Sequence, residues 1–222
     1  MTRLPSSITT VMSAALFITS LSAVPAGAAQ RSETDGIKET ANFVKAGGET
    51  SSAVAEAKLR VQNTLTAYNT LVTQPSKDMK GDYKKLLNAV KDMNESLADA
   101  RQRVTAMEAM GTTYFAGRAA SIKNIQDEQL RTQAQQRLDE SQKRYANVLT
   151  SLREAGQSLE PVRKDLGDQI TYLGSDLSPS GTASLKAQAE KLNQRAGESF
   201  SRADQAIATA NGYFNALKPA ES

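Results

Sequence analysis

The chain of 222 residues contains no cysteine, no histidine and no tryptophan. Without cysteine it cannot form a disulfide, use a thiol nucleophile or carry a lipid on a cysteine side chain. Without histidine it lacks the usual ligands of zinc, copper and di-iron sites, and it cannot assemble a Ser-His-Asp triad. We therefore expect no catalytic, metal-binding or cofactor-binding residue set.

The sequence also has no long block of charge of one sign. Its 27 lysines and arginines are offset by 24 acidic residues, and the two signs alternate, for example through 77–95. A nucleic-acid-binding protein concentrates basic residues on one face, so we expect no nucleic-acid partner despite the pI of 9.0. Peripheral membrane binding needs a basic stripe or an exposed apolar face. It stays an alternative that the mixed charges do not favour.

A secretory signal peptide is predicted at residues 1–29. Arg3 supplies the positive start, Val11–Leu21 is the apolar core, and small residues follow up to Ala29. The apolar run falls short of the ~20 residues that a membrane-spanning helix needs. We therefore expect cleavage after Ala28 or Ala29 and a periplasmic or secreted protein.

Apolar residues recur every seven positions between residues 138 and 173, which predicts a helix with a narrow buried seam. Pro161 lies inside this stretch, yet the period continues across it. An unbroken period predicts one kinked helix rather than two helices joined by a loop. The seam consists of Leu138, Tyr145, Leu152, Leu159, Leu166 and Leu173, with Val148, Ala155 and Val162 at the intervening positions.

Similar patterns predict three further helices. One starts near Thr50–Ser52 and ends before Gln74-Pro75-Ser76, one spans about 77–122, and the last begins near Pro179 or Thr182. Gly47-Gly48 is interpreted as a hinge, because adjacent glycines form helix poorly. The predicted organisation is the signal peptide at 1–29, a polar and partly flexible segment at 30–49, the helical domain at 50–218 and a tail at 219–222.

These elements predict an all-α fold, an elongated antiparallel bundle or coiled coil of three to four long helices. At about 1.5 Å per residue, helices of this length form a rod. The first predicted helix is too short to line the whole rod. Part of the long helices must then pair as a hairpin or bury its seam against another copy or a partner.

Two places could do more than pack. Asp165, Asp168 and Tyr172 follow Pro161. A weak calcium or polar-ligand site there is one alternative, but we favour a solvated surface. Tyr114 and Phe115 could border a ligand, but we expect an aromatic plug near the end of the bundle. An enzyme that works with carboxylates and tyrosines alone would need a pocket at one of these places.

The block from Gly81 to Leu217 resembles the DUF2959 family. The matching features are Leu138-x6-Tyr145, then 159–162 (LEPV), 166–173 (LGDQITYL) and 183–185 (ASL). The resemblance implies a bacterial exported protein with a long helical domain and an unknown function, and it supplies no catalytic residues. Some relatives carry a lipoprotein cysteine after the signal, where this chain has Ala28-Ala29-Gln30.

Taken together, we expect an exported, non-enzymatic helical scaffold or interaction protein of the bacterial cell envelope. A protein partner or self-association is expected, because helices of unequal length leave part of an apolar seam that must be buried against something else. The alternative is a peripheral membrane-binding helical protein.

Overall fold

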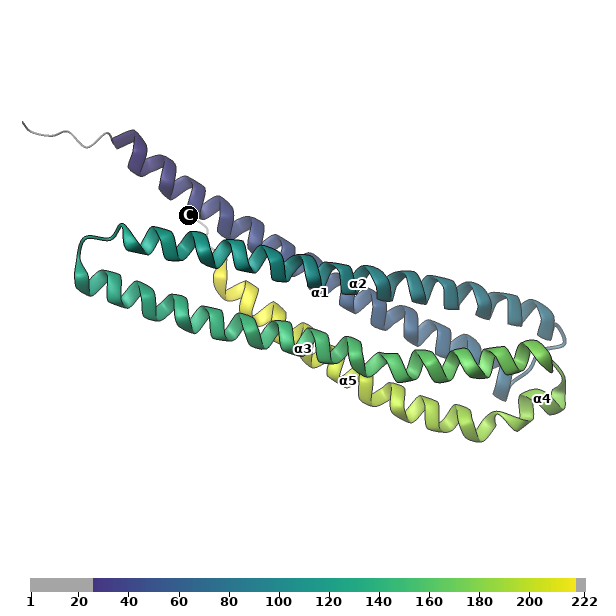
Figure 1. The fold of residues 1–222 in the computed structure, drawn as a ribbon. Helices are drawn as coiled ribbons and strands as arrows, with labels where there is room; N and C mark the ends of the chain where they lie inside the picture. The colour runs from purple at the N-terminus through teal and green to yellow at the C-terminus, as the bar shows by residue number, and fades with distance from the viewer. Residues whose placement is uncertain (1–25, 219–222) are drawn as a thin grey trace, which may run out of the picture.

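The computed structural model describes the backbone of residues 26–218 and the side chains of residues 35–218. The predicted tail at 219–222 and most of the predicted signal peptide lie outside these residues. The described chain forms five α-helices and no strand, which confirms the all-α prediction (Figure 1). The helices are α1 (Ala26–Thr73), α2 (Met79–Lys123), α3 (Glu128–Ser175), α4 (Pro179–Ser184) and α5 (Lys186–Leu217).

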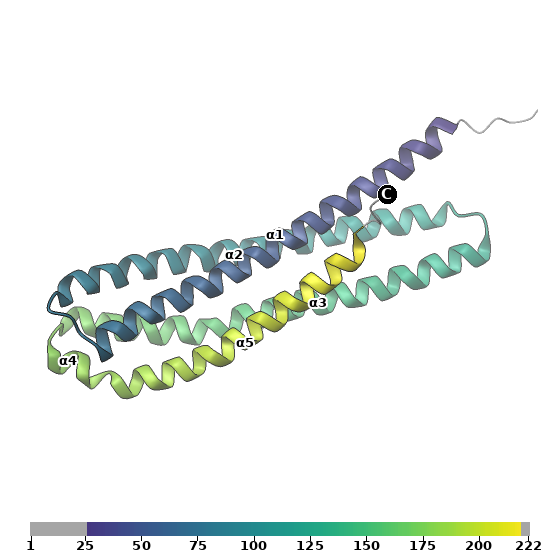
Figure 2. The same ribbon diagram turned by 180° about the vertical axis from the view of Figure 1, so that it is seen from behind.

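The four long helices run up, down, up and down and form an elongated antiparallel bundle (Figures 1 and 2). Thr64 of α1 donates its hydroxyl to the Ala89 carbonyl of α2 at 3.1 Å, so these two backbones lie close. Ser199 of α5 donates to the Ser158 carbonyl of α3 at 2.7 Å. The bundle is therefore built from two hairpins, α1 with α2 and α3 with α5, and its shape is the predicted rod. Among the described residues, no helix is apolar over a long enough stretch to cross a membrane.

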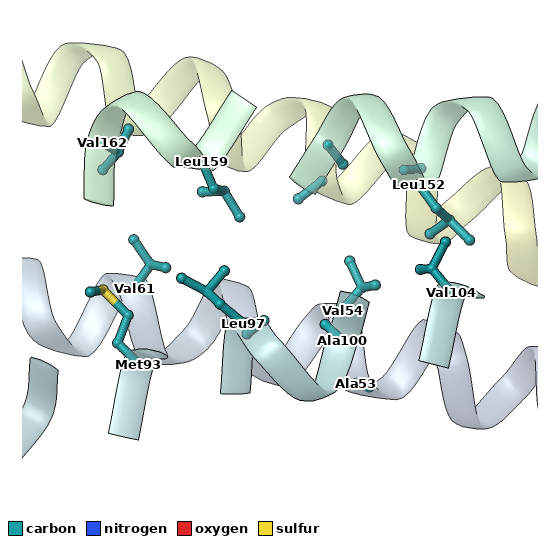
Figure 3. Packing of buried hydrophobic residues seen from close by; sticks show 14 of the residues in the cluster. Ala53, Val54, Val61, Met93, Leu97, Ala100, Val104, Leu152, Leu159 and Val162 are labelled. Carbon is teal, nitrogen blue, oxygen red and sulfur yellow. The ribbon is translucent and has the colours of Figure 1, made fainter. Parts of the chain in front are cut away.

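The heptad seam of α3 forms one wall of the core. All nine seam residues predicted from the sequence are buried, and α3 passes through Pro161 in one piece, as the unbroken period predicted. Figure 3 shows part of this seam facing the apolar residues of α1 and α2. Burying such a continuous apolar stripe is the main source of stability of a helical bundle.

The hinge predicted at Gly47-Gly48 is wrong, because α1 continues through both glycines as one helix. Gly47 is buried where the ring of Phe214 packs against α1, at the place that a β-carbon would occupy. Thr50 does not cap a helix start; its hydroxyl donates to the Ala46 carbonyl at 2.8 Å within the helix. The first helix is consequently much longer than predicted, and residues 30–49 belong to it.

The other helix boundaries follow the sequence with one exception. Asp127 caps the start of α3, where its side chain accepts a hydrogen bond from the Leu130 amide at 2.8 Å. The last helix was predicted as one element, whereas the structure has a short α4 capped by Ser178 and a break at Leu185. The side chain of Leu185 is buried in the core at this break, so the chain turns to align α5 with the bundle.

The helices end at different heights, which leaves one end of the bundle open. In Figure 1, α5 stops well before the turn that joins α2 to α3, and the first turns of α1 diverge from the bundle. The α2–α3 hairpin therefore extends past its neighbours. The sequence predicted a hairpin extension, but it assigned the short helix to the start of the chain instead of to α5.

Candidate functional site

A cluster of six aromatic side chains closes the core where α5 ends. It draws residues from all four long helices: Phe43, Tyr114, Phe115, Tyr145, Tyr213 and Phe214. Phe43 stacks on Tyr114 with ring centroids 4.4 Å apart and meets Phe214 edge-on at 5.3 Å. Such pairs add to the apolar area that each ring buries. The predicted aromatic plug is confirmed, and it includes rings that the sequence pattern did not connect.

The tyrosines of the plug have partners within the protein. Tyr145 donates its hydroxyl to the Met107 carbonyl at 2.5 Å, and the Tyr213 and Ser141 hydroxyls lie 3.0 Å apart. Burial raises the pKa of Tyr213 to about 12, since the phenolate form would lose its hydration. These hydroxyls therefore stay protonated near neutral pH, and their arrangement suits packing better than proton transfer.

An open groove lies directly beyond the plug, between the ends of α2 and α3. Its volume is about 570 Å³, and Leu217 at the end of α5 forms one border. The floor is apolar and consists mainly of Phe115, Ile122, Ile125, Ala134 and Leu138. Three arginines and one glutamate stand around it: Arg118, Arg137, Arg144 and Glu140. We refer to this site as the end groove.

Among the described residues, the arginines of the end groove are without an ion pair, as are Arg131 and Arg202, whereas the other arginines are paired. Within residues 35–218, Arg118, Arg137 and Arg144 form no ion pair, and all three side chains are exposed. Six arginines elsewhere on the bundle are each paired with an acidic side chain: Arg60, Arg101, Arg103, Arg153, Arg163 and Arg195. The end groove thus carries net positive charge next to an apolar floor, and a guanidinium is suited to bind a carboxylate or phosphate through two parallel hydrogen bonds.

The site considered near Pro161 is not assembled. Asp165 pairs with Arg195 of α5, whereas the Tyr172 hydroxyl lies 3.1 Å from the Ser184 hydroxyl of α4. Asp168 borders a shallow surface groove with Asp165, but Tyr172 does not line it. No group of three or more acidic side chains in the described part of the chain is placed to hold a metal ion. These residues therefore form separate surface contacts.

Reasoning from the sequence missed the end groove. Its arginines lie on two helices: Arg118 is on α2, and Arg137 and Arg144 follow 19 and 26 residues later on α3. In the sequence they look like ordinary helix surface. The available signal was the apolar group Ile122, Ile125 and Leu130 around the predicted turn, since a turn between two helices is usually polar. The pattern did not show that α5 ends before it could cover them.

Comparison with known protein families gives one result. A family profile described as "Protein of unknown function (DUF2959)" matches residues 30–217, from within α1 to the last residue of α5. Neither the curated proteins nor the solved structures gave a match. The match covers most of the chain, both hairpins and the end groove, and it agrees with the resemblance in the sequence motifs. The chain therefore belongs to the DUF2959 family.

Proposed function

We propose that this protein is a non-enzymatic interaction protein of the bacterial cell envelope, and that its end groove binds an acidic amphipathic helix of a protein partner. The observation that carries the proposal is the set of three arginines without an ion-pair partner in the described chain, placed around an apolar floor. The predicted signal peptide at 1–29 supports the envelope location. Arginines with one glutamate suit anion binding more than acid–base catalysis.

The shape of the end groove supports a helix as the occupant. Along most of the rod each helix has two neighbours, and the place beside α3 is taken by α5 as far as Leu217, which borders the end groove. Beyond Leu217 that place is open, and a helix laid there would continue the bundle. Its apolar face would cover Ile122 and Leu138, and its acidic face would meet the arginines.

Peripheral membrane binding remains the second candidate, because one observation favours it. Leu130 is 57% exposed at the tip of the α2–α3 hairpin, close in sequence to Ile125, which lines the end groove. An apolar tip beside arginines could enter an anionic lipid surface. The helix proposal is preferred because the apolar groove floor lies between two helices, where a rod-shaped partner fits better than a flat surface.

The proposal can be tested by photo-crosslinking in the cells that produce the protein. The photoreactive residue p-benzoylphenylalanine replaces Ser121, which borders the end groove, and in a separate control it replaces Gln74 at the opposite end of the rod. We expect a specific product from position 121 only. Its crosslinked peptide, identified by mass spectrometry, should carry acidic residues at helical spacing.

Charge reversal supplies the matched comparison. Changing Arg118, Arg137 and Arg144 to Glu should abolish the product, whereas changing Lys80, Lys84 and Lys191 to Glu alters the net charge equally and should leave it. The three lysines are exposed and also form no ion pair in the described chain. Equal effects of the two triple variants would refute a specific site. A crosslink to a second copy, or flotation with phosphatidylglycerol vesicles that depends on the arginines, would replace the partner helix with self-association or membrane binding.

A further inference from the structure

A second cavity lies in the middle of the rod, between the two hairpins. Its volume is about 420 Å³, and it opens to the surface between α2 and α3. Apolar side chains of three helices form its wall: Val54, Ala57, Leu97, Val104, Leu152 and Leu159. Figure 3 shows several of these side chains facing one another across the space. We call it the central cavity.

The cavity exists because small residues lie between two fixed contacts of α2 with α3. Toward one end, the Tyr83 hydroxyl donates to the Ile170 carbonyl at 3.2 Å. Toward the other, the Tyr145 hydroxyl donates to the Met107 carbonyl at 2.5 Å, with its ring over Gly111. Between these contacts the facing positions are Ala100, Ala155 and Gly156, which are too small to fill the gap. The two tyrosines hold α2 and α3 at a distance that the side chains of the alanines and the glycine are too small to fill.

An unfilled apolar space of this size is costly. The side chains of its wall lose packing contacts, and part of the wall meets water because the cavity is open to the surface. Water can enter through the opening, but it finds few hydrogen-bond partners along an apolar wall. The volume falls within the range of about 300–1,000 Å³ that is typical of small-molecule sites. An apolar occupant would remove the cost.

The cavity is a slot along the rod. Its lining on α2 runs from Leu97 to Thr105, and its lining on α3 runs from Leu152 to Glu160. At about 1.5 Å per residue, both stretches are roughly 12 Å long. A narrow apolar slot of this length fits an unbranched alkyl chain lying parallel to the helices better than it fits a flat ring system.

The rim adds a charge that can hold an anionic head group. Arg101 of α2 pairs across the opening with Glu160 of α3, and Arg163 lies 3.0 Å from the other oxygen of the same carboxylate. Glu160 therefore keeps a partner if Arg101 turns to a ligand. The second pair across the rim, Arg153 with Glu108, is balanced. Together with Arg163 these side chains carry one positive charge in excess, and of the two arginines paired with Glu160, Arg101 is the one that borders the opening.

We propose that the central cavity binds a single unbranched alkyl chain with an anionic head group, as in a fatty acid or a lysophospholipid. The chain fills the slot between α2 and α3, and the Arg101 guanidinium binds the head at the opening. This proposal does not rest on the function proposed for the end groove, because the two sites share no residue.

The test is isothermal titration calorimetry of the purified protein with dodecanoate below its micelle concentration. Dodecanol serves as the uncharged probe with the same chain, and 1-lauroyl-lysophosphatidylglycerol as the probe with a phosphate head. We expect one dodecanoate molecule to bind per protein molecule, and we expect dodecanol to bind more weakly. The tighter of the two anionic probes identifies the kind of head group that the site prefers.

Two variants separate the contribution of the alkyl chain to binding from that of the head group. Gly156→Leu places a side chain in the slot, where an added β-carbon meets no atom within 4 Å, and it should abolish binding of all three probes. Gly197→Leu is the matched control, since this exposed glycine of α5 also has no neighbour within 4 Å of an added β-carbon. Arg101→Gln should weaken dodecanoate binding about tenfold or more, as expected for the loss of a charged hydrogen bond, and leave dodecanol unchanged.

Several results would overturn the proposal. They are the absence of dodecanoate binding to the unaltered protein, binding that Gly156→Leu leaves intact, and equal losses in Gly156→Leu and Gly197→Leu. Circular dichroism of each variant shows whether it is folded. If Gly156→Leu does not fold, Arg101→Gln decides alone: a loss confined to the anionic probes supports the site, and an unchanged affinity for dodecanoate refutes it.

Discussion

Replacing the two adjacent glycines of α1 one at a time tests whether α1 is a single packed helix. At Gly48 an added β-carbon has no neighbour within 4 Å, and the position is exposed. Gly48→Ala should therefore raise the free energy of unfolding by about 1 kcal/mol, the difference in helix propensity between the two residues. At this size of protein that is a rise of roughly 2–4 °C in Tm.

Gly47→Ala should act in the opposite direction. Its β-carbon would occupy the space of the Phe214 ring, so the gain in helix propensity is opposed by overpacking. Overpacking of a core costs typically about 1–3 kcal/mol. We expect Gly47→Ala to lower the free energy of unfolding by up to about 2 kcal/mol. The two variants should then differ by about 1–3 kcal/mol, although they make the same chemical change at neighbouring positions.

Urea unfolding followed by far-ultraviolet circular dichroism measures this difference, and a double variant identifies its cause. Phe214→Leu shortens the side chain that Gly47 accommodates, so Gly47→Ala should be less damaging in that background. If Gly47→Ala stabilises the protein as much as Gly48→Ala does, Phe214 does not pack against α1. The interpretation of this segment as a hinge would then return.

Three further predictions follow from the core and from α3. Leu166→Ala, at a position with 0% exposure, should cost about 2–5 kcal/mol in urea unfolding, whereas Leu87→Ala, at 42% exposure, should stay within about 0.5 kcal/mol; equal costs would contradict the core assignment. Pro161→Ala should leave the protein folded and raise its free energy of unfolding by up to about 3 kcal/mol, and a variant without helical circular dichroism would show that α3 is not one helix. Burial raises the pKa of Tyr68 and of Tyr213 to about 12, so the folded state keeps protons that the unfolded state loses above pH 10. The stability that these two tyrosines contribute should therefore be constant below pH 9 and fall between pH 10 and 12 by about 1.4 kcal/mol per pH unit for each tyrosine, and a flat urea midpoint between pH 10 and 12 would refute the burial of their hydroxyls.

The helical architecture could be predicted because its information is local. A seven-residue apolar period fixes which face of α3 is buried, and it does so across Pro161. The same rule applied to α1 would have corrected the hinge. Continuing the period of Val54, Val61 and Tyr68 backwards by seven reaches Gly47, which is buried in the structure. Low helix propensity was given more weight than the period, although tertiary packing routinely overrides propensity.

The two candidate sites could not be predicted in the same way, because each depends on how the helices align. The end groove exists where α5 stops at Leu217, and a sequence pattern does not say which part of α3 lies beside that residue. The central cavity depends on Ala100, Ala155 and Gly156 facing one another from two helices. In the sequence these are ordinary small residues of a helical seam, and only their alignment in space leaves a cavity.

The up-and-down order of the helices has a practical consequence for experiments on this protein. Because the bundle has an even number of long helices, α1 begins and α5 ends at the same end of the rod, next to the end groove (Figure 1). An affinity tag or fluorescent protein joined directly after α5 would stand beside the proposed partner site and compete for it. The turn at 74–78 between α1 and α2 lies at the far end of the rod, so an epitope inserted there would report on the protein while leaving the groove accessible.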